Sequence, residues 1–279
     1  MEDSLNARRL LLEHFGMHPS GKDFWERVPI RDRKLLGSAK RHSDFLEMRL
    51  ASGPSDRPLY IFYSKQAVGS FLGRAAAIAR AIGVTQKNMI LDLLPFGSAL
   101  SGSMYCRACN KAGVGVMAVG TPNITRPELA IELIDRLRPD VWFSMPSYAL
   151  RLLAAADAKG SDCVPKKIMI SDEILSDAEL DELKKFGAEL YETYGPAECP
   201  AISTSERNRD PRIQTVVGTG AYVESVETAR GNELLVTDLN NTSTPVIRYR
   251  TGNLATDIRY GKDGSVKEFT LCQNDRSES

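Results

Sequence analysis

Short apolar runs alternate with longer stretches of helical spacing through the middle of the chain. The apolar runs, which we predict to be strands, are residues 89–94, 114–119, 141–144, 167–170 and 189–191. The stretches that we predict to be helices are residues 5–15, 66–81, 98–112, 128–137, 147–158 and 176–185. Strands that alternate with helices are typical of βαβ units, so the pattern predicts an α/β fold with a mostly parallel sheet flanked by helices.

Two serines lie where predicted helices begin. Ser176 is followed three residues later by Glu179, which is the spacing of a capping box. Ser147 follows Pro146 at the start of another helix, where we expect it to be the N-cap.

The pattern changes after Cys199. Residues 233–236, 246–249 and 266–270 are short apolar runs separated by Gly and Asn turns, with no helical stretch between them. We therefore predict an α/β lobe over residues 1–198, followed by a small β-rich subdomain over residues 199–279.

A ligand site is expected at one edge of the parallel sheet, because such sheets bind ligands beyond the carboxyl ends of their strands. The segments that follow the predicted strands there are residues 95–97, 145–147, 171–173 and 194–196.

Charge and cysteine content exclude several classes of function. The 36 basic and 36 acidic residues cancel, so no electrostatic footprint for nucleic acid or an anionic membrane is expected. No apolar run reaches transmembrane length, and the acidic N-terminus has no apolar signal segment. The five cysteines are an odd number in a long chain and indicate reduced thiols in a cytoplasmic protein.

Three segments carry recognisable motifs. Residues 192–198 read Glu-Thr-Tyr-Gly-Pro-Ala-Glu, residues 248–254 read Arg-Tyr-Arg-Thr-Gly-Asn-Leu, and residues 51–58 read Ala-Ser-Gly-Pro-Ser-Asp-Arg-Pro. With residues 145–150 and 171–173 between them, they resemble the adenylate-forming (AMP-binding) enzyme superfamily in its phenylacetate–CoA ligase-like branch. The resemblance runs from about residue 45 to the end of the sequence, and we expect the C-terminal lobe that the family carries to be absent.

The resemblance implies a chemistry and a set of roles. Enzymes of this family join a carboxylate to ATP, forming an acyl-adenylate and releasing pyrophosphate, with Mg²⁺ on the phosphates. Glu198 is the expected metal ligand and, with Arg250, the expected catalytic residue. The residues expected to bind ATP or AMP are Ser52, Gly53 and Ser55 of the phosphate loop, Ser171, Asp172 and Glu173 beside the base, Thr193, Tyr194 and Gly195, and Asn253 at the ribose. Phe96, Gly97 and Tyr148 are expected at the substrate, with core packing the alternative for Phe96 and Tyr148.

The sequence departs from the family pattern in four places. Pro54 and Asp56 replace hydroxyl and Gly positions of the phosphate loop; Pro lacks an N–H donor, and an ionised Asp repels a triphosphate. Ala197 replaces a hydroxyl residue, and Asn253 replaces Asp at the ribose position. The fourth departure is that no counterpart is expected for the lysine that the family carries in its C-terminal lobe. ATP-dependent adenylation and a related condensation with an amine both stay open.

The remaining candidate residues are better interpreted as packed or solvated side chains than as functional ones. Cys106 and Cys109 form a C-x-x-C on a predicted helix without a second pair, and Cys199 has no histidine near it in sequence. His42 is interpreted as a surface residue. The Ala-rich stretch 71–81 packs either internally or against a second subunit, so a homodimer is one alternative.

Two functions follow as hypotheses. The first is a minimal enzyme of small-molecule or natural-product biosynthesis that acts on a small carboxylate, with an amine as the alternative co-substrate. The second is a non-catalytic homologue that acts as a binding or partner protein. An intermediate hypothesis is an enzyme that works with a separate polypeptide, which supplies the missing lobe or is a carrier protein.

Overall fold

The computed structural model describes residues 28–33, 45–51, 59–218 and 220–272. The helix predicted at residues 5–15 lies outside these ranges. So do His42 and the phosphate-loop positions, which are Ser52, Gly53, Pro54, Ser55 and Asp56.

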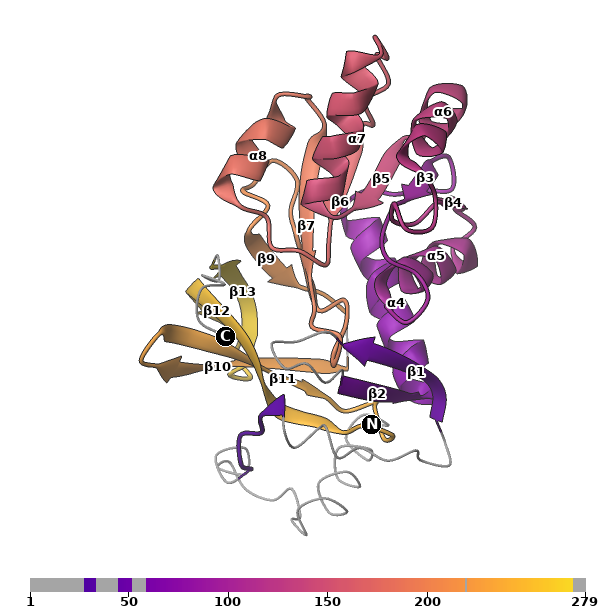
Figure 1. Ribbon diagram of the computed structural model, residues 1–279. Coiled ribbons are helices and arrows are strands. Elements are labelled where there is room, and N and C mark those ends of the chain that lie inside the picture. The colour runs from indigo at the N-terminus through magenta and orange to yellow at the C-terminus, as the bar shows by residue number, and fades with distance from the viewer. Residues whose placement is uncertain (1–27, 34–44, 52–58, 219, 273–279) are drawn as a thin grey trace.

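One mixed sheet of 11 strands is the main structural element of the described chain (Figure 1). Its parallel half is ordered β4-β3-β5-β6-β7. These strands are β3 (Met89–Asp92), β4 (Gly115–Ala118), β5 (Val141–Ser144), β6 (Lys167–Ile170) and β7 (Glu189–Tyr194). The α/β fold with a parallel sheet is therefore confirmed.

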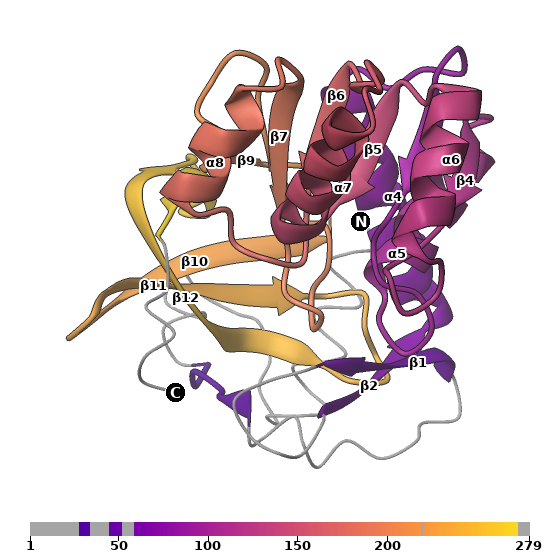
Figure 2. The same cartoon turned by 45° about the horizontal axis from the view of Figure 1, so that its top comes forward.

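Helices cover both faces of the parallel half, as Figure 2 shows. On one face lie α4 (Lys65–Ala81) and α5 (Ser101–Lys111); on the other lie α6 (Pro127–Leu137), α7 (Pro146–Ala158) and α8 (Asp177–Lys184). Successive residues of β5 serve opposite cores: Val141 and Phe143 face α4 and α5, whereas Trp142 faces α6 to α8. Strands buried on both faces read as continuous apolar runs, which is why the sequence revealed them.

The strands after Cys199 continue the same sheet rather than standing apart from it. β7 pairs with β8 in the antiparallel sense, and the order runs on through β9, β13, β12 and β11 to β10. These strands are β8 (Ser203–Ser205), β9 (Ile213–Val216), β10 (Ala221–Thr228), β11 (Gly231–Asp238), β12 (Val246–Tyr260) and β13 (Val266–Leu271). The predicted β-rich segment is thus present, with hydrogen bonds that cross the predicted division at residue 199.

A hairpin that the sequence pattern did not indicate lies beside the sheet. β1 (Phe45–Ala51) and β2 (Leu59–Ser64) pair in the antiparallel sense, with Leu46 and Met48 exposed on β1 and Tyr60 exposed on β2. Its last residue, Ser64, accepts a hydrogen bond from Ala67 N and is the N-cap of α4. Ser64 Oγ also donates to Asn240 O at 2.9 Å, so the hairpin is tied to the segment that follows β11.

The helix starts show one success and one error. The Ser176–Glu179 capping box of α8 is present. The N-cap of α7 is Met145, with Pro146 as the first helical residue, so the prediction for Ser147 is wrong. A proline at the first helical position needs no N–H partner, so the helix begins at Pro146, one residue earlier in the chain than predicted. Ser147 Oγ instead donates to Glu173 Oε2 at 2.8 Å.

Helix α4 packs inside its own subunit. Phe71, Ala75 and Ile78 are buried in the core that α4 shares with α5 and the sheet. Of the two alternatives for this Ala-rich helix, internal packing accounts for its apolar face, and the homodimer stays a prediction. Within the described residues, no helix has the length and apolar character needed to cross a membrane.

Candidate functional site

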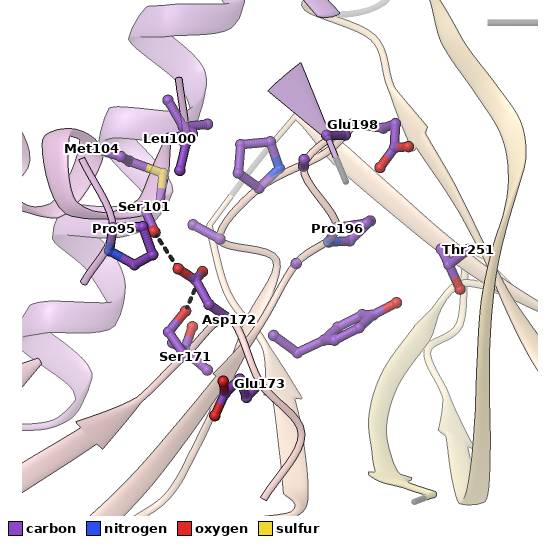
Figure 3. Close-up of a pocket in the computed structure, with 18 of the residues that line it drawn as sticks. Pro95, Leu100, Ser101, Met104, Ser171, Asp172, Glu173, Pro196, Glu198 and Thr251 are labelled. Carbon is purple, nitrogen blue, oxygen red and sulfur yellow. Dashed lines mark hydrogen bonds between the residues drawn. The ribbon is translucent and has the colours of Figure 1, made fainter. Parts of the chain in front are cut away.

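A cavity of about 540 Å³ opens at the carboxyl edge of the parallel strands, where the sequence predicted a site. Its walls come from the segments that follow β3, β5, β6 and β7, from the start of α5, and from β12 across the opening. Figure 3 shows Ser101, Ser171 and Asp172 grouped on one wall, with Glu198 and Thr251 on another. The volume is ordinary for a small-molecule site.

The segment after β6 forms the floor of this cavity. Ser171, Asp172 and Glu173 all line it, as the sequence predicted. Asp172 has φ of +69°, a left-handed conformation that Asp adopts more readily than most residues. The Ser101 hydroxyl donates to Asp172 Oδ2 at 2.5 Å, so the start of α5 fixes the position of this carboxylate.

The segment after β7 forms a second wall. Thr193, Tyr194 and Gly195 line the cavity. A Cβ added to Gly195 would lie 2.3 Å from Ala201 N, so glycine is needed there for the chain to fold back on itself. The Tyr194 hydroxyl donates to Asn253 Oδ1 at 3.1 Å, although Asn253 itself is not among the lining residues.

Glu198 is the most buried acidic residue that lines the cavity, with 3% of its surface exposed. The Tyr249 hydroxyl donates to Glu198 Oε1 at 2.8 Å, and Arg33 Nη1 lies 3.3 Å from the same oxygen. Burial and the adjacent Glu198 carboxylate raise the pKa of Tyr249, so this hydroxyl stays a donor. Tyr63 holds the preceding residue by donating to the carbonyl of Ala197.

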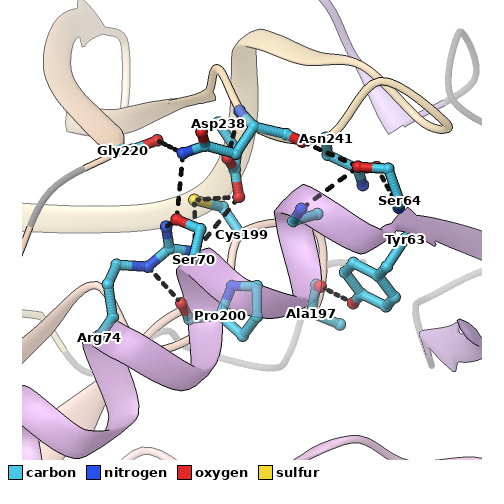
Figure 4. A network of polar contacts seen from close by, with 12 residues as sticks. Tyr63, Ser64, Ser70, Arg74, Ala197, Cys199, Pro200, Gly220, Asp238 and Asn241 are labelled. Atoms are coloured by element: carbon cyan, nitrogen blue, oxygen red, sulfur yellow. Dashed lines mark hydrogen bonds and ion pairs between the residues drawn. The ribbon is translucent and has the colours of Figure 1, made fainter. Parts of the chain in front are cut away.

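A buried polar network supports this wall from behind (Figure 4). Arg74 of α4 is 1% exposed and donates to Pro200 O at 3.1 Å, and its Nη2 lies 3.2 Å from Asp238 Oδ2. Cys199 Sγ is 3.9 Å from the same Asp238 oxygen. Burial raises the pKa of Cys199, so its thiol is a poor nucleophile and its packing interpretation fits the structure.

The C-x-x-C pair also fits the packing interpretation. Cys109 is buried in the core around α5, and burial raises its pKa to about 12. All five cysteines lie in the described part of the chain, and none of them is in a disulfide.

Besides Asn253, four predicted residues in the described part of the chain lie outside the cavity lining. Arg250 Nη1 pairs with Glu233 Oε2 at 2.7 Å, because alternation along β12 turns its neighbours toward the cavity instead. Tyr148 is 2% exposed within the core beside α6 to α8. Phe96 lies against Gly102, and Gly97 adopts φ of +84° next to it. Tyr148 thus takes the core-packing alternative, and the roles of Arg250, Phe96 and Gly97 stay predictions.

Several lining residues were not among the predicted site residues, and Arg33, Tyr249 and Thr251 matter most for the site. Tyr249 and Thr251 lie on β12, where the alternation with the two arginines of the motif was a usable signal. Arg33 lies in a polar, weakly patterned segment that offered none.

A model of the AMP-binding enzyme family matches residues 63–240, which is more than half of the chain and includes most of this cavity. The chain belongs to the AMP-binding enzyme family. The predicted resemblance is confirmed, and the adenylate-forming ligases are its fold relatives.

Two curated relatives are phenylacetate–coenzyme A ligases. The protein of Pseudomonas putida is 22% identical over 246 residues, covering 81% of this chain and 54% of the relative. That of Escherichia coli K12 is 24% identical over 226 residues, covering 75% and 50%. The chain therefore spans about half the length of these relatives.

Solved structures share the fold of this AMP-binding enzyme. A 2-hydroxyisobutyryl-CoA ligase in complex with 2-HIB-AMP and CoA superimposes with a TM-score of 0.77 at 17% identity, covering 96% of this chain and 64% of that one. The amide bond synthetase McbA from Marinactinospora thermotolerans gives 0.60 at 17%, covering 95% and 57%. At such identities the likeness establishes the fold.

Glu198 fits the modest needs of Mg²⁺ at a nucleotide. Protein-bound Mg²⁺ commonly takes one or two carboxylates, with phosphates and water completing its shell. Glu198 offers one carboxylate that lines the cavity and is fixed by Tyr249. No group of three or more metal-ligating side chains occurs among the described residues, so phosphate oxygens and water would have to supply the other ligands of the ion.

Glu192 is a second buried carboxyl group, one residue before the cavity lining begins on β7. It is 2% exposed, and its Oε1 accepts a hydrogen bond from Leu175 N at 3.1 Å. Its Oε2 has no partner within the described chain. Burial raises the pKa of Glu192 to about 8, so the side chain is neutral near pH 7.

We expect Glu192→Gln to remove part of the pH dependence of stability. Between the unfolded pKa of about 4.5 and the folded value of about 8, the folded wild type binds one proton more than the unfolded chain. Wild-type stability therefore falls as pH rises through this window. The variant should match wild type near pH 5 and exceed it by a few kcal/mol at pH 8.5. Urea unfolding at both pH values measures this, and parallel profiles would refute it.

Proposed function

We propose that this chain binds ATP or AMP together with a small carboxylate in the cavity and forms an acyl-adenylate there. The observation that carries the proposal is the convergence of segments 171–173 and 193–198 and the β12 motif on one cavity at the sheet edge of an AMP-binding family member. In the step proposed, a carboxylate oxygen forms a bond to the α-phosphorus, and pyrophosphate leaves.

The roles proposed for the residues follow their positions. Tyr194 presents a ring at the cavity, with its hydroxyl held by Asn253, and would stack on the adenine. Glu198 would hold Mg²⁺, which when bound neutralises charge on the phosphates. Asp172 and Glu173 would accept hydrogen bonds from the base. Ser52, Gly53 and Ser55 are proposed phosphate-loop contacts on sequence grounds alone.

The acyl group of the adenylate would then be transferred to an acceptor. Coenzyme A is the partner in the names of the curated relatives, and an amine is the alternative suggested by the amide bond synthetase fold relative. A cytoplasmic location and a role in biosynthesis are part of the same proposal.

Nucleotide binding is the first test. Calorimetry of the purified chain with ATP, AMP and adenosine, with and without Mg²⁺, should show binding of all three. A panel of carboxylates is then screened by ATP–pyrophosphate exchange, and exchanging substrates are offered CoA or amines. Absence of binding at millimolar nucleotide would reject the proposal.

A non-catalytic binding protein is the second candidate. The observation that favours it is the engagement of Glu198 by both Arg33 and Tyr249, which occupies Oε1, one of the two carboxylate oxygens that a metal ion would use. Nucleotide binding without exchange for any carboxylate, and without turnover with amines, would support this alternative.

A further inference from the structure

A segment far from the family motifs reaches the cavity by docking on β12. Arg31 N donates to Arg248 O at 3.0 Å, and Arg250 N donates to Arg31 O at 2.9 Å. Arg248 Nη1 also donates to Val28 O at 2.7 Å. This short ladder places the next residues of the segment beside Tyr249, whose side chain faces the cavity.

Arg33 extends from this ladder into the cavity. Its Nη1 lies 3.3 Å from Glu198 Oε1, and its Nη2 donates to Ala51 O at 2.8 Å. The side chain keeps 26% of its surface exposed. A guanidinium carries five N–H donors, so these two contacts do not exhaust it.

Charge distribution gives this side chain its significance. Among the described residues that line the cavity, Arg33 is the only basic one, whereas Asp172, Glu173 and Glu198 are acidic. An anionic ligand entering such a cavity meets repulsion from the carboxylates. Planar, partly desolvated guanidinium groups are well suited to oxyanions, because they offer paired N–H donors and a fixed positive charge.

We propose that Arg33 binds the phosphate oxyanion of a nucleotide in this cavity, independently of any metal. The inference rests on the function proposed above and adds a residue that belongs to none of the family motifs in this sequence. Glu198 then has a second task, because its ion pair with Arg33 aims the guanidinium into the cavity.

The test compares ligands with and without a phosphate, in EDTA, so that no metal mediates the contact. We expect Arg33→Met to weaken AMP binding by roughly 10- to 100-fold, the loss typical of one charge-assisted contact, and to leave adenosine affinity within about twofold. Arg33→Lys should retain part of the AMP affinity. Arg80→Met, which removes an exposed arginine from α4, is the matched control and should bind both ligands as wild type does.

Each contrary outcome identifies what has failed. Equal AMP affinity in Arg33→Met and wild type overturns the phosphate role and leaves the proposed function standing. Parallel loss of AMP and adenosine means that Arg33 only shapes the cavity, and also overturns it. Benzoate is titrated in the same way as a ligand that carries a carboxylate and no phosphate. If Arg33→Met loses benzoate binding while its AMP affinity is unchanged, the phosphate role is overturned and the guanidinium is assigned to a carboxylate. If wild type binds neither nucleotide nor nucleoside, the proposed function falls and this inference with it.

Discussion

Replacing Glu198 by glutamine should lower the rate of carboxylate-dependent ATP–pyrophosphate exchange by about 10²–10³, the usual loss when a charge placed for the transition state is removed. The substitution keeps the size of the side chain and an oxygen that Tyr249 can donate to, so the loss is one of charge. It should also remove the part of ATP affinity that depends on Mg²⁺, because a neutral amide is a weak ligand for a hard cation.

Two comparisons separate this loss of charge from a folding defect. Glu227→Gln neutralises an exposed carboxylate on β10 and should leave exchange, ATP affinity and its Mg²⁺ dependence unaltered. Adenosine binding to Glu198→Gln should equal that of wild type, since the nucleoside carries no phosphate. If exchange and Mg²⁺ dependence survive in Glu198→Gln, the metal role assigned to this residue is wrong.

The parallel half of the fold could be predicted because its sequence signals are local. The predicted strands at residues 141–144 and 167–170 coincide with β5 and β6, since buried strands are short apolar runs with sharp polar boundaries. β12 was predicted over four residues and extends from Val246 to Tyr260, because Ala255 is the only buried residue of its second half and no apolar run marks this part of the strand.

The cavity was predictable only where its residues belong to contiguous motifs. Residues 171–173 and 193–198 each follow a strand end, so the rule for parallel sheets places them together. Arg33 approaches Glu198 across 165 residues, and this contact depends on backbone hydrogen bonds to β12 that no side-chain pattern encodes. Arg250 shows the converse: its motif was recognised, but the alternation of a strand decided which side chains face the cavity.

Removing the buried Arg74 guanidinium should have the largest effect on stability. Asp238 is 2% exposed, and Arg74→Met would leave its carboxylate without the cation 3.2 Å away. Loss of one partner of a buried pair typically costs about 3–5 kcal/mol. Burial alone would lower the pKa of Arg74, but the adjacent Asp238 raises it overall, so the guanidinium stays charged in the wild type.

This loss should be partly recovered when the stranded charge is also removed. Asp238→Asn keeps the Oδ1 that accepts from Asn240 N, so the double variant Arg74→Met/Asp238→Asn should be more stable than Arg74→Met alone. Urea unfolding of the two single variants and the double variant gives the coupling energy of the pair. Arg80→Met, on the exposed side of the same helix, is the control for loss of an arginine and should shift the midpoint little.

The same pair should affect the cavity, because Arg74 also holds the carbonyl of Pro200, two residues after Glu198. AMP binding should therefore weaken in Arg74→Met under conditions where the variant is still fully folded, and the double variant should not restore it, since neither substitution returns a donor to Pro200 O. Recovery of AMP affinity together with stability would instead mean that the network supports only the fold. An unfolding midpoint that stays at the wild-type value in Arg74→Met would show that this ion pair does not stabilise the protein.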